Sequence, residues 1–308
     1  MTRTTNPDSI LARLKNLWRE RYPNIPPNAM LQLYAQQGFL ARLDASRYGD
    51  NCVLKGAMSL FTRYGNAARP TQDLDLATRD FPNTPEQIFS LLAELCAVPF
   101  GDGLVFNPAS IQVEPINEQL EYPGVKATVQ AELGSSQVKL QIDFSFGNVI
   151  TPAPVELTFP PLLIEEGVQV AVYPLETVIT EKFAALVEIG EATTRMKDLY
   201  DLHVILGREE FGAELVSQAL ERSFAARGTP RARVADILGD DFAQDEVLNT
   251  RWKQYLTMVR AVLRSQRKTH RKWGCEHTAS NGSNGYPTVR SQRGPAAQDA
   301  AEFSDRAA

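Results

Sequence analysis

The chain has 308 residues, of which 43% are hydrophobic and 22% charged, and its formal net charge is −5. This composition is typical of a globular protein with room for two domains, and it excludes a chain that is basic over its whole length. The sequence has no run of about eighteen apolar residues that would predict a membrane span. Its first ten residues lack the apolar segment of a signal peptide, so we expect a cytoplasmic protein without a membrane partner.

The three cysteines are far apart and odd in number, at positions 52, 96 and 275. They predict neither a disulfide framework nor a zinc site. A reducing compartment is the simplest interpretation.

The first 50 residues are predicted to form a helical segment. Apolar residues recur at helical spacing between positions 8 and 47. Pro23, Pro26 and Pro27 interrupt this pattern and divide the segment into two helices. We interpret the apolar faces of both helices as packing surfaces.

A small-residue junction follows a short apolar strand at 51–54. Lys55, Gly56 and Ala57 come directly before the apolar pattern of a helix at 57–64. Backbone N–H groups at the start of a helix can bind phosphate. The stretch 65–71 is then predicted to be a loop, and it carries Arg69.

Asp73 and Asp75 alternate with Leu74 and Leu76 in the next predicted strand. Residues two apart in a strand point to the same face, so the two carboxylates would lie together and the leucines would be buried. Such a pair repels unless a cation lies between its members, and Mg²⁺ prefers hard oxygen ligands of this kind. Taken alone, however, an Asp-x-Asp sequence is more often a solvated turn or strand edge.

Strands dominate the region that follows, with one helix predicted at 85–97. Strands are expected at 104–106, 111–114, 125–129 and 138–147, and the Pro-rich stretch 151–163 is expected to be an extended connection. In the strand at 138–147, Asp143 lies on the polar face. It would add a third carboxylate to the pair, or it is a solvent-facing residue of a half-exposed strand.

The remainder is predicted to be mostly helical, with helices at 175–189, 196–207, 212–224 and 245–264. Residues beyond 265 are rich in Gly, Ser, Ala and Pro, which indicates disorder. The sequence thus predicts an α+β protein with four parts: a helical segment (1–50), a strand-rich core (51–172), a helical domain (173–265) and a disordered tail (266–308).

Residues 251–273 carry eight Lys or Arg and no acidic residue. This stretch is either a solvated helix end or a site of electrostatic attraction for RNA phosphates. Its three large aromatic residues, Trp252, Tyr255 and Trp273, are few for a surface that stacks bases.

Five blocks of the sequence, in this order, resemble the AbiEii/AbiGii-type nucleotidyltransferase toxin family. They span roughly 41–206 and read LDASRYGDNCVLKGAMSLF, RPTQDLDL, IDFSFGNVITPAP, YPLETVITEKFAALVEIG and TRMKDLYDL. The resemblance implies a polymerase-β-like nucleotidyltransferase core with a mixed sheet. Several blocks in the correct order are far more specific than the acidic pair alone.

The resemblance assigns the metal and the chemistry to three carboxylates. Asp73 and Asp75 would bind the metal of the nucleoside triphosphate, which is Mg²⁺, in the family's two-metal arrangement. Asp143 would complete the set and help to activate the attacking hydroxyl.

The same resemblance assigns phosphate contacts and a last acidic motif. Gly56 would lie in the turn that cradles the nucleotide, and Lys182, six residues after Glu176, would contact the triphosphate. Asp198 and Asp201, in KDLYDL, match the final acidic motif. Lys55 and Arg69 would flank the site and pair with phosphates.

Ala57 departs from the family pattern, which has a second Gly there, or a Ser in the wider superfamily. Ala would weaken phosphate binding if the position required a positive φ or a hydroxyl group. It is harmless if the position needs only a small residue at a helix start, and we favour this second interpretation.

The resemblance implies an NTP-dependent transferase that moves NMP onto a hydroxyl of RNA, such as the 3′ end of tRNA. It would act as the toxin of a toxin–antitoxin, phage-defence type system, with an antitoxin protein as its partner. Two alternatives remain open: transfer onto a protein or a small molecule, and a non-catalytic protein that binds nucleotide or a partner.

Overall fold

The computed structural model describes residues 6–22, 27–65, 68–69, 71–82, 84–116, 124–164 and 167–273. Contacts group the chain into a large unit, Met1–Thr269, and a small one, His270–Ala308. The large unit contains the sheet and the helices, apart from the last residues of the final helix.

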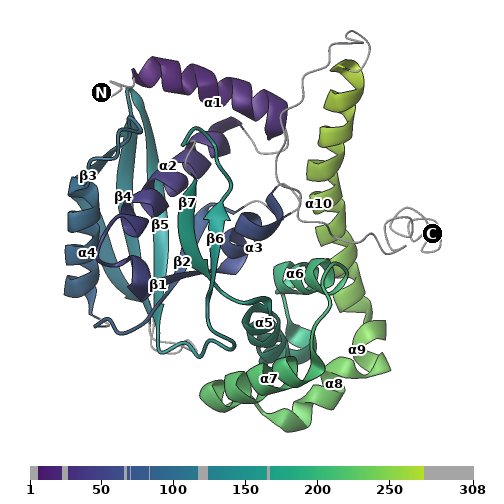
Figure 1. Cartoon of the computed structure of the whole chain (residues 1–308). Helices are drawn as coiled ribbons and strands as arrows, with labels where there is room; N and C mark the ends of the chain where they lie inside the picture. The colour runs from purple at the N-terminus through teal and green to yellow at the C-terminus, as the bar shows by residue number, and fades with distance from the viewer. Residues whose placement is uncertain are drawn as a thin grey trace. The chain divides into compact units, whose positions relative to one another are not determined.

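A mixed sheet of seven strands forms the centre of the large unit (Figure 1), in the order β3-β4-β5-β2-β1-β7-β6. The central strand β2 pairs in parallel with β5 and antiparallel with β1. The strands are β1 (Cys52–Lys55), β2 (Asp73–Thr78), β3 (Val105–Ile116), β4 (Gly124–Leu133), β5 (Ser136–Phe146), β6 (Val155–Phe159) and β7 (Val168–Val172).

Ten α-helices accompany the sheet in the described residues. They are α1 (Pro7–Arg21), α2 (Pro27–Asp44), α3 (Gly56–Tyr64), α4 (Pro85–Ala97), α5 (Leu175–Ile189), α6 (Met196–Leu206), α7 (Ala213–Arg227), α8 (Val234–Leu238), α9 (Asp240–Gln244) and α10 (Glu246–Trp273). Local signals explain the start of α4: the Thr84 hydroxyl accepts a hydrogen bond from the Gln87 N–H, and Pro85 occupies the first turn.

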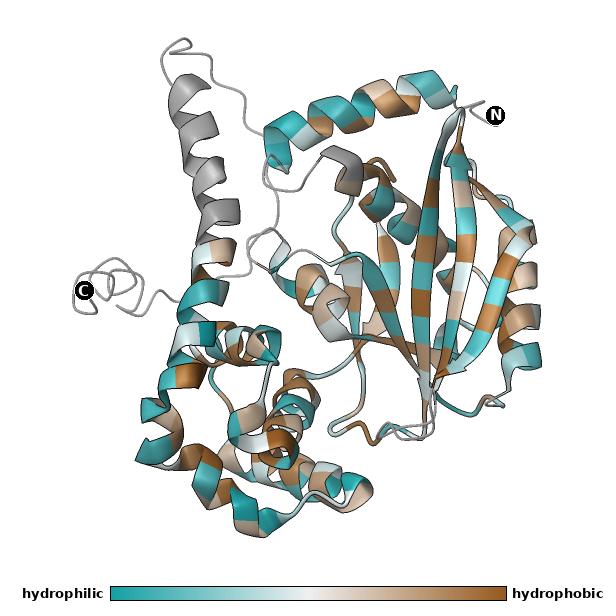
Figure 2. Ribbon diagram, turned by 180° about the vertical axis from the view of Figure 1, so that it is seen from behind, coloured by the Kyte–Doolittle hydropathy of each residue, from teal (hydrophilic) through white to brown (hydrophobic). Residues whose placement is uncertain are grey.

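Side-chain alternation along the central strands separates two hydrophobic cores. Leu74 and Leu76 of β2 are buried in one core with residues of α1, α2 and α4. Val53 of β1 and Ala77 of β2 belong to the other core, which contains residues of α3 and of the helices from α5 onwards. Figure 2 shows the alternation as bands of brown and teal along the strands. Asp75 shares the face of Ala77, so it lies on the side of the C-terminal helices.

The predicted α+β class is confirmed, and α4 and α5 have the predicted bounds. Three expectations need correction. The stretch 151–163 contains strand β6, and β3 is one strand with a register shift between Asn107 and Gln112 where two strands were expected. Helix α10 continues to Trp273, past the expected boundary at 265.

Some expectations fall outside the described residues. These are the break at Pro23 and Pro26 and the predicted tail from 274 to 308. Cys52 and Cys96 are free thiols, whereas Cys275 lies in the part that is not described. No helix in the described ranges is both long enough and apolar enough to cross a membrane.

Candidate active site

Gly56 is the tightest point of the junction between β1 and α3. Its φ is +62°, and a Cβ built on it would lie 2.0 Å from Oδ2 of Asp75. Only glycine combines this backbone conformation with such a close neighbour. The Ser59 hydroxyl donates a hydrogen bond of 2.8 Å to the Gly56 carbonyl and is itself buried. The turn is thus built directly against the Asp75 carboxylate.

Strand register places four charged residues in one row across the sheet. Lys55 pairs with Asp75, Asp75 with Asp143, and Asp143 with Lys126. Residues paired across neighbouring strands point to the same face. Asp143 is therefore the direct neighbour of Asp75, as the prediction that it joins the acidic pair requires. Asp73 lies two residues earlier on the same face and is exposed.

Helix α2 anchors the chain just before the acidic strand. The side-chain amides of Gln32 and Gln36 both donate to the Gln72 carbonyl, at 3.1 and 2.8 Å. Both glutamines are buried. This attachment fixes the register from which Asp73 and Asp75 project.

The central carboxylates are held in an environment that disfavours their charge. Burial raises the pKa of Asp75, and the charges of Asp143 and Asp73 raise it further, while Lys55 and Arg69 act in the opposite direction. Burial likewise raises the pKa of Asp143, against the influence of Lys126. Carboxyl groups whose pKa is raised in this way are typical of functional sites.

One buried carboxylate oxygen supports a cation at this site. Oδ1 of Asp143 is buried and has no hydrogen-bond partner in the described part of the chain. Carboxylate oxygens suit Mg²⁺, which also takes phosphate oxygens as ligands. No three acidic, His or Cys side chains of the described residues already form a metal-holding group. Asp75 and Asp143 thus offer carboxylate oxygens to Mg²⁺, which commonly completes its shell with water and phosphate oxygens.

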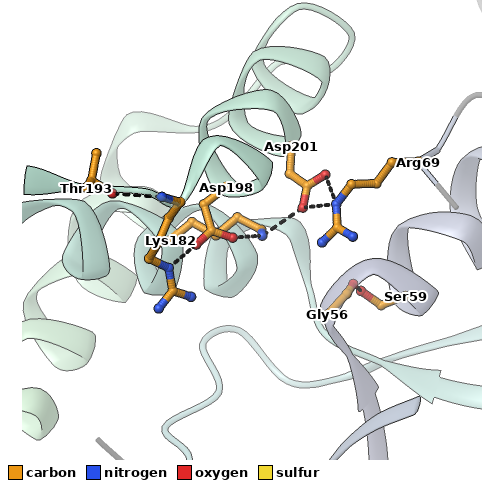
Figure 3. A network of polar contacts seen from close by, with 8 residues as sticks. Gly56, Ser59, Arg69, Lys182, Thr193, Asp198 and Asp201 are labelled. Atoms are coloured by element: carbon orange, nitrogen blue, oxygen red, sulfur yellow. Dashed lines mark hydrogen bonds and ion pairs between the residues drawn. The ribbon is translucent and has the colours of Figure 1, made fainter. Parts of the chain in front are cut away.

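A second group of charged side chains lies on the helices (Figure 3). Lys182 of α5 donates to Oδ1 of Asp198 at 2.6 Å and to Oδ2 of Asp201 at 2.8 Å. Arg69 donates through Nε to both oxygens of Asp201, at 3.1 and 3.2 Å. Arg195 adds a hydrogen bond to Asp198. We call these five residues the helical ion network.

The helical ion network compensates its own charges. Asp198 and Asp201 are 7% and 2% exposed, yet each accepts hydrogen bonds from two cations. Burial alone would raise the pKa of Asp198, but Lys182 and Arg195 lower it below its ordinary value. Arg69, which comes from the loop before β2, ties this network to the sheet.

A cavity of about 270 Å³ joins the two groups. It is lined by seven of the residues predicted from the sequence, namely Lys55, Gly56, Ala57, Arg69, Asp75, Lys182 and Asp198. Three predicted residues do not line it. Asp201 contacts Lys182 and Arg69 from behind, Asp143 neighbours Asp75 in the sheet, and Asp73 is exposed.

Sequence reasoning missed three charged residues that line this cavity: Glu181, Arg195 and Arg227. Burial raises the pKa of Glu181, whose Oε1 accepts a hydrogen bond of 3.2 Å from the Tyr173 hydroxyl. Glu181 directly precedes Lys182, and Arg195 precedes Asp198 by three residues, so proximity to the motifs was an available signal. Arg227 reaches the cavity from the end of α7, and no motif marks it.

The structure answers the backbone part of the question raised by Ala57. Glycines apart, only Asp80 among the described residues has a positive φ, so Ala57 does not. Its side chain is 2% exposed at the start of α3. The position therefore requires a small residue and no special backbone conformation.

The sequence profile of the AbiEii family, described as the nucleotidyl transferase AbiEii toxin of a Type IV toxin–antitoxin system, matches residues 38–274. The match covers most of the chain, and the chain belongs to this family. Comparison with curated proteins gave no match.

Two solved structures from Helicobacter pylori are similar to this chain. One is JHP933, with 18% identity and a TM-score of 0.43, covering 80% of this chain and 96% of its own. The other is a candidate nucleotidyltransferase, with 20% identity and a TM-score of 0.42, covering 82% of this chain and 99% of its own.

Proposed function

We propose that this protein transfers NMP from an NTP to an acceptor hydroxyl, with the cavity between Gly56 and Lys182 as the nucleotide site. The observation that carries the proposal is the contact between Gly56 and Asp75. It places the start of α3 directly beside a carboxylate whose pKa is raised by burial and by the neighbouring Asp143 and Asp73. Phosphate binds at such helix starts, and a metal–phosphate group would relieve the unmet negative charge.

Cations surround the place that a triphosphate would occupy. Lys55, Arg69 and Lys182 line the cavity together with Asp75. They bind and orient the phosphates, and Lys182 offsets the charge that develops on the leaving pyrophosphate. Since Lys182 is already bonded to Asp198 and Asp201, the triphosphate competes with these carboxylates for it.

The carboxylates Asp73, Asp75 and Asp143 would hold Mg²⁺, which neutralises phosphate charge and favours in-line displacement when bound. The acceptor oxygen forms a bond to the α-phosphorus while the bond to the bridging oxygen breaks and pyrophosphate leaves. Asp143, which neighbours Asp75 in the sheet, accepts the hydroxyl proton.

We further propose RNA, including the 3′ end of tRNA, as the acceptor, and a role as a cytoplasmic toxin in phage defence with a cognate antitoxin. The family description supports a toxin with an antitoxin. We also propose residues 51–172 and 173–265 as two domains, whose residues together line the cavity.

The test is incubation of the purified protein with Mg²⁺, each α-³²P-labelled NTP in turn and total RNA, resolved on a denaturing gel. Label should enter RNA with the correct NTP and fall by at least about a hundredfold in Asp75→Asn. Asp44→Asn, an exposed substitution at the end of α2, is the matched control and should keep full transfer.

Label in protein, or release of pyrophosphate with a small-molecule acceptor alone, would replace RNA by another acceptor class. Nucleotide binding in titration calorimetry without any transfer would replace the enzyme by a nucleotide-binding protein. Full transfer by a folded Asp75→Asn protein would overturn the site itself.

A further inference from the structure

An open groove of about 770 Å³ begins beside the nucleotide cavity. Its walls are the start of α6 with the residues just before it, and one face of α10. Arg69, Arg195 and Asp198 line both the groove and the cavity, so the two spaces adjoin. A molecule lying in the groove would therefore have one end at the proposed phosphate site.

The groove is strongly cationic, although the whole chain has a net charge of −5. Its lining includes Arg69, Arg195, Lys197 and Arg251. The acidic residue in the lining, Asp198, is already bonded to Lys182 and Arg195. Lys197 is exposed, and the side chain of Arg195 is 51% exposed, so both are open to an anion. This charge is complementary to a polyanion.

Aromatic and apolar groups lie among these cations. Tyr255 and Met258 follow Arg251 at helical spacing and line the groove from α10. The Tyr255 ring stacks on Trp252, with centroids 6.3 Å apart and an interplanar angle of 22°, and it contacts Tyr200 edge-on at 5.9 Å. Met258 is 55% exposed. A supported aromatic ring beside cations is the combination that binds bases and phosphates of single strands.

We propose that the groove binds a single-stranded polynucleotide acceptor and directs its terminal hydroxyl to the nucleotide cavity. The proposal rests on the proposed function and names the path of its acceptor. Cations at the α6 start hold phosphates, and Tyr255 stacks on a base, which a single strand exposes and a duplex covers. Arg251 has a second role: its Nη1 donates to the Thr193 carbonyl at 3.0 Å and holds the segment before α6. It is therefore left unchanged in the test.

The first experiment measures the affinity of the full chain for a fluorescent single-stranded RNA of about twelve nucleotides, as a function of salt concentration. Lys197→Gln should weaken binding and reduce the slope of log K against log salt by about 0.7, the value for one phosphate contact on a single strand. Lys253→Gln is the matched control, because Lys253 is an exposed α10 lysine that is not among the groove's lining residues. An unchanged slope in Lys197→Gln, or an equal fall of the slope in Lys253→Gln, would contradict RNA binding by the groove.

The second experiment changes the stacking ring. Tyr255→Leu should weaken RNA binding by about tenfold or more, whereas Tyr255→Phe keeps the ring and should bind like the wild type. Both proteins should show a cooperative thermal unfolding transition and should bind NTP with the affinity of the wild type. Equal RNA affinity of the Leu and Phe proteins, or tighter binding of a duplex than of the single strand, would contradict the proposal.

The failure of the groove and the failure of the proposed function give different results. Asp75→Asn should bind RNA like the wild type while losing transfer. If RNA binding depends on Lys197 and Tyr255 but the wild type transfers no NMP, the proposed function is overturned, whereas RNA binding by the groove is supported. If transfer to RNA is the same when either residue is changed, the proposed function is supported, whereas RNA binding by the groove is overturned.

Discussion

The charged row of the sheet and the helical ion network lie on two sides of one cavity, but their electrostatics are opposite. In the row, burial and neighbouring carboxylates raise the pKa of Asp75, and Oδ1 of Asp143 has no described partner. In the network, Asp198 and Asp201 are at least as deeply buried, yet Lys182, Arg69 and Arg195 compensate them. The carboxylates of both regions are at least partly buried, but the pKa of Asp75 and Asp143 is raised whereas that of Asp198 is lowered.

This difference indicates separate tasks for the two regions. A carboxylate whose ionised form is disfavoured in the folded protein is stabilised when a cation binds, so it is suited to ligand binding. A carboxylate that is fully bonded has little to gain, and breaking its bonds is costly. We therefore assign metal binding and chemistry to the sheet row, and positioning of Lys182 and Arg69 to the network.

The largest effect on stability is expected from Lys182→Met. This change leaves Asp198 and Asp201 buried with one cation fewer each, and the free energy of unfolding should fall by about 3–5 kcal/mol. Urea denaturation measures it. Lys253→Met, at an exposed position, is the control and should change little. A stability equal to that of the wild type would mean that the network does not hold the helices in place.

Gly56→Ala tests whether the turn and the row act as one unit. The positive φ and the 2.0 Å approach to Asp75 predict a loss of about 1–3 kcal/mol in unfolding free energy and a strong loss of transfer. Gly228→Ala is the matched control, because Gly228 has a φ of +66° but no atom within 4 Å of the added Cβ. It should lose only the backbone part of the stability and keep transfer. Equal transfer rates in the two variants would show that the Gly56 turn does not position Asp75 for transfer.

Asp75→Asn should stabilise the protein in the absence of metal and nucleotide, by a few degrees in Tm, since about 1 kcal/mol corresponds to about 2–4 °C. The folded-state pKa of Asp75 is raised, so its charged form destabilises the fold above that pKa. The gain should thus be largest above the raised pKa and shrink as the pH falls towards the ordinary value of 3.8. Thermal melts across this range would contradict the assignment if the gain were independent of pH.

Ala57→Gly is expected to give the smallest effect. Because Ala57 is buried in the first turn of α3 without a positive φ, restoring the family's glycine should cost about 0.5–1 kcal/mol of unfolding free energy. Transfer should not increase. A clear gain in transfer would show that the alanine impairs phosphate binding after all.

The strand pattern was sufficient to predict which face the acidic side chains of β2 and β5 share, but not that Lys126 lies in the same row. The alternation of Asp73 and Asp75 with buried leucines specified their face, and the polar face of β5 added Asp143. The bounds of α4 and α5 followed from prolines and apolar spacing. Strand β6 was missed because a short edge strand between prolines has the composition of a connection.

The helical ion network shows what the sequence could not supply. The family motifs identified Lys182, Asp198 and Asp201 as site residues, but no spacing rule says that they bond to one another or to Arg69. These contacts depend on how α5 and α6 pack and on the loop before β2. The same holds for Arg227, whose place in the cavity is set by the packing of α7 against α5.

The central claim is tested most directly by measuring NMP transfer and thermal stability together for Asp75→Asn and Asp201→Asn. The account predicts that Asp75→Asn loses transfer and gains stability, because it removes a charge that burial and neighbouring carboxylates disfavour and that only the chemistry requires. Asp201→Asn should lose stability, because Lys182 and Arg69 lose their shared partner. A stable Asp75→Asn protein that still transfers NMP at the wild-type rate, or an Asp75→Asn protein less stable than Asp201→Asn, would contradict it.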